Sequence, residues 1–192
     1  MPDTVALNAA AGSLAVLLVV SEVLITATRA PHGTDHQDRG TGLVITAGLA
    51  GALGGALATA NVGTGPAIAG SSWLLLATGL AVGLAGLGLR LWAVVTLGHL
   101  FQQRLVVQEG HTVVQSGPYR LIRHPSYAGP LVLFIGIGLV LDNWVGLALC
   151  LVLPFAAYAW RVVVEERMLV RSLGPDYVAY QARTWRLVPG LW

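Results

Sequence analysis

Residues 73 to 97 read WLLLATGLAVGLAGLGLRLWAVVTL, an apolar run that contains a single charged residue, Arg90. A helix needs about 20 consecutive apolar residues to cross the hydrocarbon core of a bilayer. This run is therefore predicted to be a transmembrane helix that is long enough to tilt or to project beyond the membrane.

Four further apolar runs lie on either side of this stretch. Together the runs predict an all-α, polytopic integral membrane protein with about five transmembrane helices. The first run follows no basic segment and exceeds the core of a signal peptide, so it is predicted to be retained. The fourth is short for a full crossing, and only Asp142-Asn143 separates it from the fifth, which predicts a tight antiparallel hairpin. The four runs cover residues 9–28, 42–60, 127–141 and 144–164.

Composition supports a membrane protein and excludes other classes. Of the 192 residues, 55% are apolar and only 10% are charged, against about 25% charged residues in an average soluble domain. The mean hydropathy is +0.71. These values exclude a soluble enzyme, a disordered chain and a disulfide-rich secreted domain, and they favour one membrane domain. The net charge of +2 gives no reason to expect nucleic acid, and Cys150 is the single cysteine.

The arginines predict an orientation. Apart from Arg90, they lie between the first and second runs, between the third and fourth, and at or after the end of the fifth, whereas residues 1–8, 61–72 and the Asp142-Asn143 turn carry none. The positive-inside rule then places the N-terminus outside and every arginine-bearing connection in the cytoplasm.

Chemistry-bearing residues are concentrated in the second half of the chain. We therefore expect one membrane domain in which residues 1–97 form a three-helix scaffold and residues 98–192 form a cofactor-binding half with a pocket at the cytoplasmic face. Two G-x-x-x-G spacings, Gly51/Gly55 and Gly79/Gly83, indicate close helix packing, either within the chain or across a dimer.

A turn before the fourth run collects aromatic and basic residues. Gly117-Pro118 is a turn signal, and Pro125 forces His124 out of helical geometry while suiting the first position of a helix. His124 would then lie at a helix N-terminus that can receive an anionic group. Tyr119 and Tyr127 offer aromatic faces for an adenine ring or a sulfonium. The alternative is an anchor belt at the membrane interface.

The end of the fifth run carries Arg161 and Glu165, which are four residues apart on one helix face. They form either a simple helix ion pair or a charged pair that separates two ligands. Two ionisable residues lie deeper, Glu22 and Arg90, and structural roles are favoured for both. His99 is interpreted as a helix cap.

A metal site is not expected. The five histidines lack the H-E-x-x-H spacing, although His32 and His36 in the first loop leave a weak alternative. The sequence also lacks a G-x-S-x-G elbow and a P-loop.

Three elements carry a resemblance to a known family. They are GPYRLIRHPSYAG (117–129), EERML (165–169) and GPDYVAY (174–180). In this combination the chain, from about Leu89 to Trp192, resembles the isoprenylcysteine carboxyl methyltransferase family, whose broader group includes phospholipid methyltransferases.

The resemblance implies S-adenosylmethionine as the methyl donor, with S-adenosylhomocysteine as the product. Arg161 would orient the substrate, and Arg123 is the second residue predicted to be catalytic. The predicted cofactor contacts are Gln108, His111, Thr112, Val113, Val114, Tyr119, His124, Pro125, Ser126, Tyr127, Glu165 and Glu166.

The expected activity is carboxyl O-methylation of an isoprenylcysteine-like or other lipophilic acceptor, which would enter from the bilayer while the cofactor arrives from the cytoplasm. The alternatives are phospholipid N-methylation, thiol S-methylation and, from another class, a non-enzymatic membrane scaffold or small transporter. A sterol-reductase-like enzyme, which would need a nicotinamide cofactor, is more distant.

Overall fold

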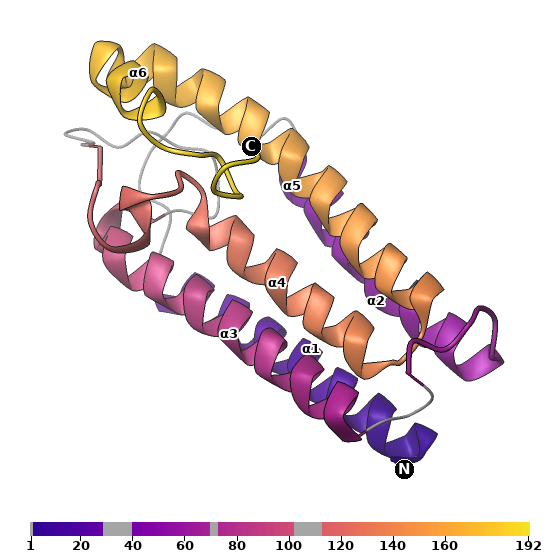
Figure 1. Ribbon diagram of the computed structural model, residues 1–192. Coiled ribbons are helices and arrows are strands. Elements are labelled where there is room, and N and C mark those ends of the chain that lie inside the picture. Colours follow the sequence, from indigo (N-terminus) through magenta and orange to yellow (C-terminus); the bar gives the residue numbers. More distant parts are fainter. Residues whose placement is uncertain (1, 29–39, 70–72, 102–112) are drawn as a thin grey trace.

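The computed structural model describes residues 2–28, 40–69, 73–101 and 113–192, which fold mainly into helices (Figure 1). Within these ranges, four helices are long and apolar enough to cross a membrane, and a fifth apolar helix, α4, is shorter. The predicted all-α, polytopic membrane fold is confirmed. The elements are α1 (Thr4–Thr28), α2 (Thr41–Val62), α3 (Trp73–Leu97), η1 (Gly98–Leu100), η2 (Gly117–Arg120), α4 (Pro125–Val140), α5 (Trp144–Leu173) and α6 (Pro175–Gln181).

The five long helices lie side by side and alternate in direction (Figure 1). At one end, α1, α3 and α5 finish while α2 and α4 begin, and the short elements η1, η2 and α6 gather there. We call this end the arginine-rich end, because the described arginines outside α3 lie at or near it. The N-terminus lies at the opposite end.

Helices α3 and α4 pack with their backbones in contact. A Cβ atom added to Gly86 of α3 would lie 2.5 Å from the backbone nitrogen of Leu133 and 2.6 Å from the carbonyl oxygen of Gly129, both on α4. Gly79 meets α4 in the same way, whereas Gly83 faces Leu14 of α1. The glycine spacing of α3 therefore serves packing within the chain, as small residues do between membrane helices.

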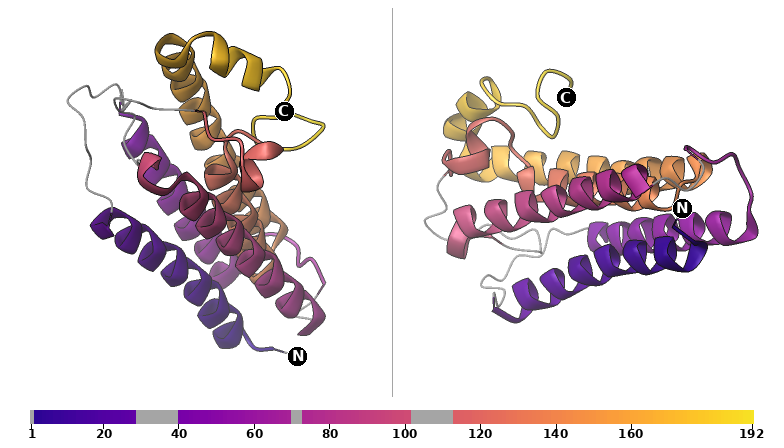
Figure 2. Two further views of the ribbon diagram at one scale, coloured as in Figure 1. Left: turned by 90° about the vertical axis from the view of Figure 1, so that its left-hand side faces the viewer. Right: turned by 60° about the horizontal axis from the view of Figure 1, so that its bottom comes forward.

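Helices α1 and α2 pack against different partners in the bundle. α2 packs along α5, and α1 packs on α3 and α4, so α1 and α2 touch each other little. Figure 2 shows them as separate rods on the same side of the molecule. At the end away from η2, the side-chain amide of Asn8 on α1 donates to Asn61 of α2 at 2.8 Å. The two helices are thus joined there by a polar contact.

Local chemistry sets most helix boundaries. α4 begins at Pro125, as predicted, and His124 before it has φ −124° and ψ 55°, outside the helical region. The predicted hairpin is present, and Asn143 caps α5 by accepting a hydrogen bond from the Gly146 N–H at 2.9 Å. The predicted start of α1 was wrong, because Asp3 accepts a hydrogen bond from the Ala6 N–H and caps a helix that begins at Thr4.

The apolar run that ends near residue 164 is shorter than the helix that contains it. α5 continues to Leu173, through residues 165–173, because Glu, Arg, Met and Leu end the apolar run but favour helix. Apolarity therefore marks the membrane crossing, and helix propensity sets the length of the helix.

Candidate active site

The turn before α4, residues 121–124, pairs through its backbone with the C-terminal segment, residues 182–192. The N–H of Arg123 donates to the Trp185 carbonyl at 2.7 Å, and the N–H of His124 donates to the Arg186 carbonyl at 3.0 Å. The Trp185 N–H donates in return to the Leu121 carbonyl at 3.0 Å. Segments about 60 residues apart in sequence are thereby paired like neighbouring strands, and the turn that presents His124 has a fixed backbone.

Glu166 lies at the centre of a buried ion cluster. Its carboxylate accepts from the Nε atoms of Arg123 at 2.7 Å and Arg186 at 2.9 Å. Arg123 also donates to the backbone carbonyls of Gln181 and Thr184. These contacts join α5, the turn and the C-terminal segment, and they favour structural roles for Arg123 and Glu166 over the predicted catalytic and cofactor roles.

Glu165 points in another direction, because neighbouring side chains on a helix diverge by about 100°. The Tyr127 hydroxyl donates to Glu165 at 2.7 Å. His124 lies between the two carboxylates, with Nδ1 3.8 Å from Glu165 and Nε2 3.4 Å from Glu166. The His124 ring is stacked on Tyr127, with centroids 5.6 Å apart, and Tyr127 is stacked on Tyr158 at 5.1 Å. Three predicted site residues therefore meet at this point.

Tyr127 also connects Glu165 to Arg161. Its hydroxyl accepts a hydrogen bond from the Arg161 Nε atom at 3.2 Å, and Arg161 donates to the Thr41 hydroxyl of α2 at 2.7 Å. Arg161 is only 2% exposed. A buried guanidinium is costly unless its hydrogen bonds are satisfied, so this network fixes Arg161 in one position.

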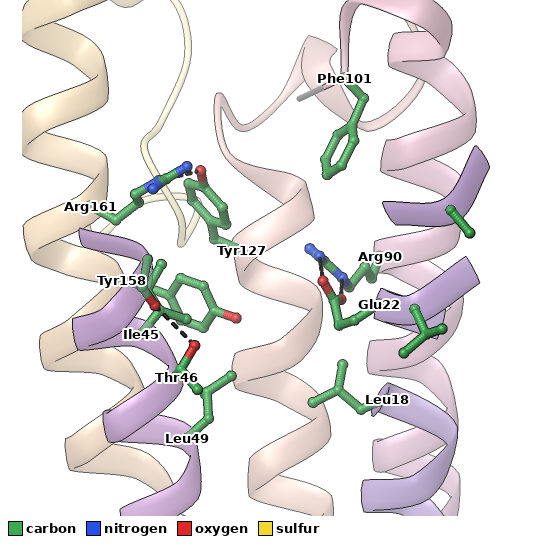
Figure 3. A pocket seen from close by; sticks show the side chains of 13 residues that line it. Leu18, Glu22, Ile45, Thr46, Leu49, Arg90, Phe101, Tyr127, Tyr158 and Arg161 are labelled. Carbon is green, nitrogen blue, oxygen red and sulfur yellow. Dashed lines mark hydrogen bonds and ion pairs between the residues drawn. The ribbon is translucent and has the colours of Figure 1, made fainter. Parts of the chain in front are cut away.

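A cavity of about 600 Å³ lies against this network, and Figure 3 shows its side chains. Arg161, Tyr127 and Tyr158 form one wall, and Arg90 and Glu22 form the other. The remaining lining is largely apolar and comes mainly from α1 and α2: Leu18, Val23, Ala27, Gly42, Ile45, Thr46, Leu49 and, after η1, Phe101. The cavity therefore combines charged groups on two walls with an apolar remainder.

The ion pair between Glu22 and Arg90 was missed by the sequence analysis. Arg90 contacts the Glu22 carboxylate through Nε and, at 2.6 Å, through a terminal nitrogen. Its other terminal nitrogen donates to the Ser126 carbonyl at 2.6 Å. One sequence signal could have predicted this pair. Glu22 and Arg90 are opposite charges in two apolar runs, and each lies a few residues before the C-terminal end of its helix.

The backbone of Tyr119 in η2 is held by a hydrogen bond from α6. Its carbonyl oxygen accepts a hydrogen bond from the Tyr180 hydroxyl of α6 at 2.7 Å, and burial raises the pKa of Tyr180 to about 12, so this donor keeps its proton. The Tyr119 side chain is buried, and its own hydroxyl has no hydrogen-bond partner in the part of the chain that the structure describes. A buried, unpaired hydroxyl is a group that a ligand can satisfy.

The other predicted contacts fall into two groups. Val113 and Val114 are half-buried and lead into η2, while Pro125 and Ser126 form the buried first turn of α4. Gln108, His111 and Thr112 lie outside the described residues, as do His32 and His36. Among the residues that are described, no group of three His, Cys, Asp or Glu side chains is placed to hold a metal ion.

Helices of this length around a charged cavity define a polytopic integral membrane protein with a candidate ligand site at one end of its bundle. Residues 78–171 match the model of the isoprenylcysteine carboxyl methyltransferase family, so the chain is related to that family through α3, α4 and most of α5.

Similar curated proteins include protein-S-isoprenylcysteine O-methyltransferase B of Arabidopsis thaliana, which is 32% identical over 119 residues, or 61% of this chain and 60% of the relative. A cobalt-zinc-cadmium resistance protein of Cupriavidus metallidurans is 33% identical over 119 residues, or 62% of this chain and 50% of the relative. The solved structure of a eukaryotic intramembrane Ras methyltransferase is similar with a TM-score of 0.58 at 29% identity, covering 61% of this chain and 43% of that chain. The match thus spans about three fifths or less of each of these relatives.

Proposed function

We propose that this protein is an S-adenosylmethionine-dependent methyltransferase that modifies the carboxylate of a lipophilic, isoprenylcysteine-like acceptor at its arginine-rich end. The observation that carries the proposal is the Tyr127 hydroxyl, which binds Arg161 on the cavity side and Glu165 on the other side. A cation for an acceptor carboxylate and an anion for a cationic donor would thereby be linked through one phenol hydroxyl.

The chain has groups of the right chemistry for the donor around His124. Glu165 supplies a carboxylate, the rings of His124 and Tyr127 supply aromatic faces, and the start of α4 supplies the positive end of a helix dipole, which favours an anionic group. The unpaired Tyr119 hydroxyl is a further polar contact. When bound, S-adenosylmethionine supplies a methyl group that is activated by its cationic sulfur.

The cavity suits the acceptor. Arg161 would hold the acceptor carboxylate, and the apolar lining from Leu18, Ile45 and Leu49 would hold its hydrocarbon tail. Because α1 and α2 touch each other little, the tail would pass between them from the bilayer. The arginines at this end favour a cytoplasmic orientation for the site, with the N-terminus outside.

A carboxylate acceptor needs no general base. Its pKa of roughly 4 means that it is already ionised at neutral pH, so the protein has to orient it and exclude water. Arg161 performs the first task from a buried position, and the apolar cavity wall performs the second. Removing water also strengthens the attraction between the acceptor anion and the donor cation.

The test is labelled methyl transfer by the purified protein in detergent. Three acceptors with similar tails are compared: an S-prenylated cysteine analogue, an ethanolamine phospholipid and an alkyl thiol. Transfer to the prenylcysteine carboxylate is expected. Preferential labelling of the amine or the thiol would establish one of the other methyltransferase activities, and a protein that fails to bind the donor would be a scaffold or transporter.

The Arg161 assignment is tested with the same acceptor. Arg161→Gln should raise KM for the carboxylate by at least about tenfold, because it removes a charge-assisted hydrogen bond. Arg183→Gln removes an exposed guanidinium from the same end of the protein and should leave KM near the wild-type value. Equal KM values for the two variants would contradict the assignment.

A further inference from the structure

A second hollow lies beside the last turns of α5. It is separate from the cavity of about 600 Å³ shown in Figure 3, which we call the acceptor cavity after the function proposed above. It has a volume of about 410 Å³ and is bounded by the last turns of α5 and by the C-terminal segment. We call it the α5 groove, and its lining residues are Val163, Glu166, Arg167, Val170, Arg171, Gln181 and Arg186. It shares no lining residue with the acceptor cavity, and its one carboxylate, Glu166, belongs to the ion cluster described above.

The α5 groove carries excess positive charge. Its carboxylate, Glu166, is already bound by Arg123 and Arg186. Arg167 and Arg171 are exposed, lie one turn apart on the same face of α5, and form no ion pair with any residue that the structure describes. Two uncompensated guanidiniums therefore face the same hollow, and guanidinium groups bind phosphate oxygens in a bidentate manner.

Two exposed tryptophans near this end of the bundle indicate where the membrane surface is expected relative to the groove. Trp160 and Trp185 near this end are 54% and 47% exposed, and tryptophans at such positions are typical of the membrane–water interface. Arg167 and Arg171 follow Trp160 along α5 by about 10 Å and about 16 Å, at 1.5 Å per residue. Because side chains on a helix tilt toward its N-terminus, both arginines reach back toward the lipid headgroups.

The groove also has an apolar part. Val163 and Val170, on the same stretch of α5 as the arginines, belong to its lining. A free inorganic anion makes no use of these side chains, whereas the glycerol and upper acyl carbons of a phospholipid do. The combination of phosphate-binding and apolar groups therefore favours a lipid over a soluble anion.

We propose that the α5 groove binds the phosphate of an anionic phospholipid, with Arg167 and Arg171 as its principal ligands and Arg186 and Gln181 at its rim. The occupied groove would fix the end of α5, whose preceding turns carry Glu165 and Glu166. This site is independent of the methyltransferase activity proposed above.

Native mass spectrometry of the whole protein in neutral detergent tests the proposal. The probes are dioleoylphosphatidylglycerol, dioleoylphosphatidylcholine with the same tails, and soluble glycerol phosphate. Each arginine near a lipid surface contributes measurably to attraction, so the wild type should bind the anionic lipid roughly tenfold more tightly than the zwitterionic lipid. Glycerol phosphate should not compete at concentrations near those of the lipid.

Matched variants separate a defined groove from general surface charge. The double substitution Arg167→Gln and Arg171→Gln should reduce the preference for the anionic lipid to within about twofold, whereas Arg120→Gln with Arg183→Gln removes the same charge elsewhere and should retain it. Arg167→Lys with Arg171→Lys keeps the charge and should retain part of the preference.

Several results would overturn the proposal: equal binding of both lipids by the wild type, equal losses in the two glutamine variants, or full competition by glycerol phosphate. None of these measurements needs a methyl donor or acceptor, so the lipid site can fail while the activity stands, and the reverse also holds.

Discussion

Glu22 on α1 and Arg90 on α3 form a two-pronged ion pair on the wall of the acceptor cavity, although they are 68 residues apart in sequence. The same guanidinium binds the Ser126 carbonyl at the start of α4. One side chain thus connects the first helix, which lies outside the matched residues 78–171, to the turn that presents His124. The residues that match the family model and the N-terminal helix meet at this contact.

Breaking the ion pair should cost stability. Glu22→Gln leaves Arg90 buried with a weaker partner, and we expect the free energy of unfolding to fall by about 2 kcal/mol, below the value for a fully buried pair because Glu22 is one third exposed. Thermal unfolding in detergent of both single variants and of the double variant with Arg90→Gln measures the coupling. Strictly additive losses would show that the two residues do not act together.

The adjacent carboxylates Glu165 and Glu166 should behave differently. Glu165→Gln is expected to weaken S-adenosylmethionine binding by at least about tenfold, measured by calorimetry, with little change in unfolding temperature. Glu166→Gln should instead lower the unfolding temperature, because Arg123 and Arg186 lose their shared charged partner. The two variants differ by one position and carry the same chemical change. If Glu166→Gln alone weakened donor binding, the assignments would be reversed.

Tyr127→Phe should slow turnover more than it weakens either ligand. The ring and its stacking remain, but the hydroxyl that joins Arg161 to Glu165 is lost. We expect kcat to fall by about tenfold, the effect of a small misplacement of two ligand-binding groups. Tyr158→Phe removes a hydroxyl from the adjacent stacked ring and should lower kcat less. Equal kcat values for Tyr127→Phe and the wild type would contradict the linking role.

Two glycines of α3 offer a matched test of the helix packing. Gly86→Ala places a Cβ atom within 2.6 Å of the α4 backbone, whereas Gly88→Ala meets nothing within 4 Å. Overpacking of this kind costs about 1–3 kcal/mol, so Gly86→Ala should lower the unfolding temperature. Gly88→Ala should leave the unfolding temperature unchanged or raise it, because alanine favours helix. A similar loss in both variants would argue against backbone contact between α3 and α4.

The sequence predicts what depends on local chemistry. Apolar length predicts the spans, and Pro125 predicts both the start of α4 and the non-helical backbone of His124. The meeting of His124, Tyr127 and Glu165 was anticipated by the family resemblance rather than by spacing.

Relationships between distant segments were not predictable in this way. Whether Glu22 faces Arg90, or Arg161 reaches Thr41, depends on the rotation and depth of two helices relative to each other, and hydropathy fixes neither. The contacts of Arg123 were not predictable for a related reason, because its partners Gln181 and Thr184 lie at and just beyond the end of the short helix α6. Placing that helix requires the complete fold.

The division of the bundle has a consequence for turnover. α2 packs on α5 and is joined to it by the Arg161–Thr41 hydrogen bond, while α1 is joined to α3 by the Glu22–Arg90 ion pair. α1 and α2 contact each other through Asn8 and Asn61, at the end away from the arginine-rich end. The space between α1 and α2 is therefore closed at the Asn8–Asn61 end and opens onto the cavity at the arginine-rich end. Under the proposed function, a lipophilic product would leave by diffusing sideways between these two helices into the surrounding leaflet.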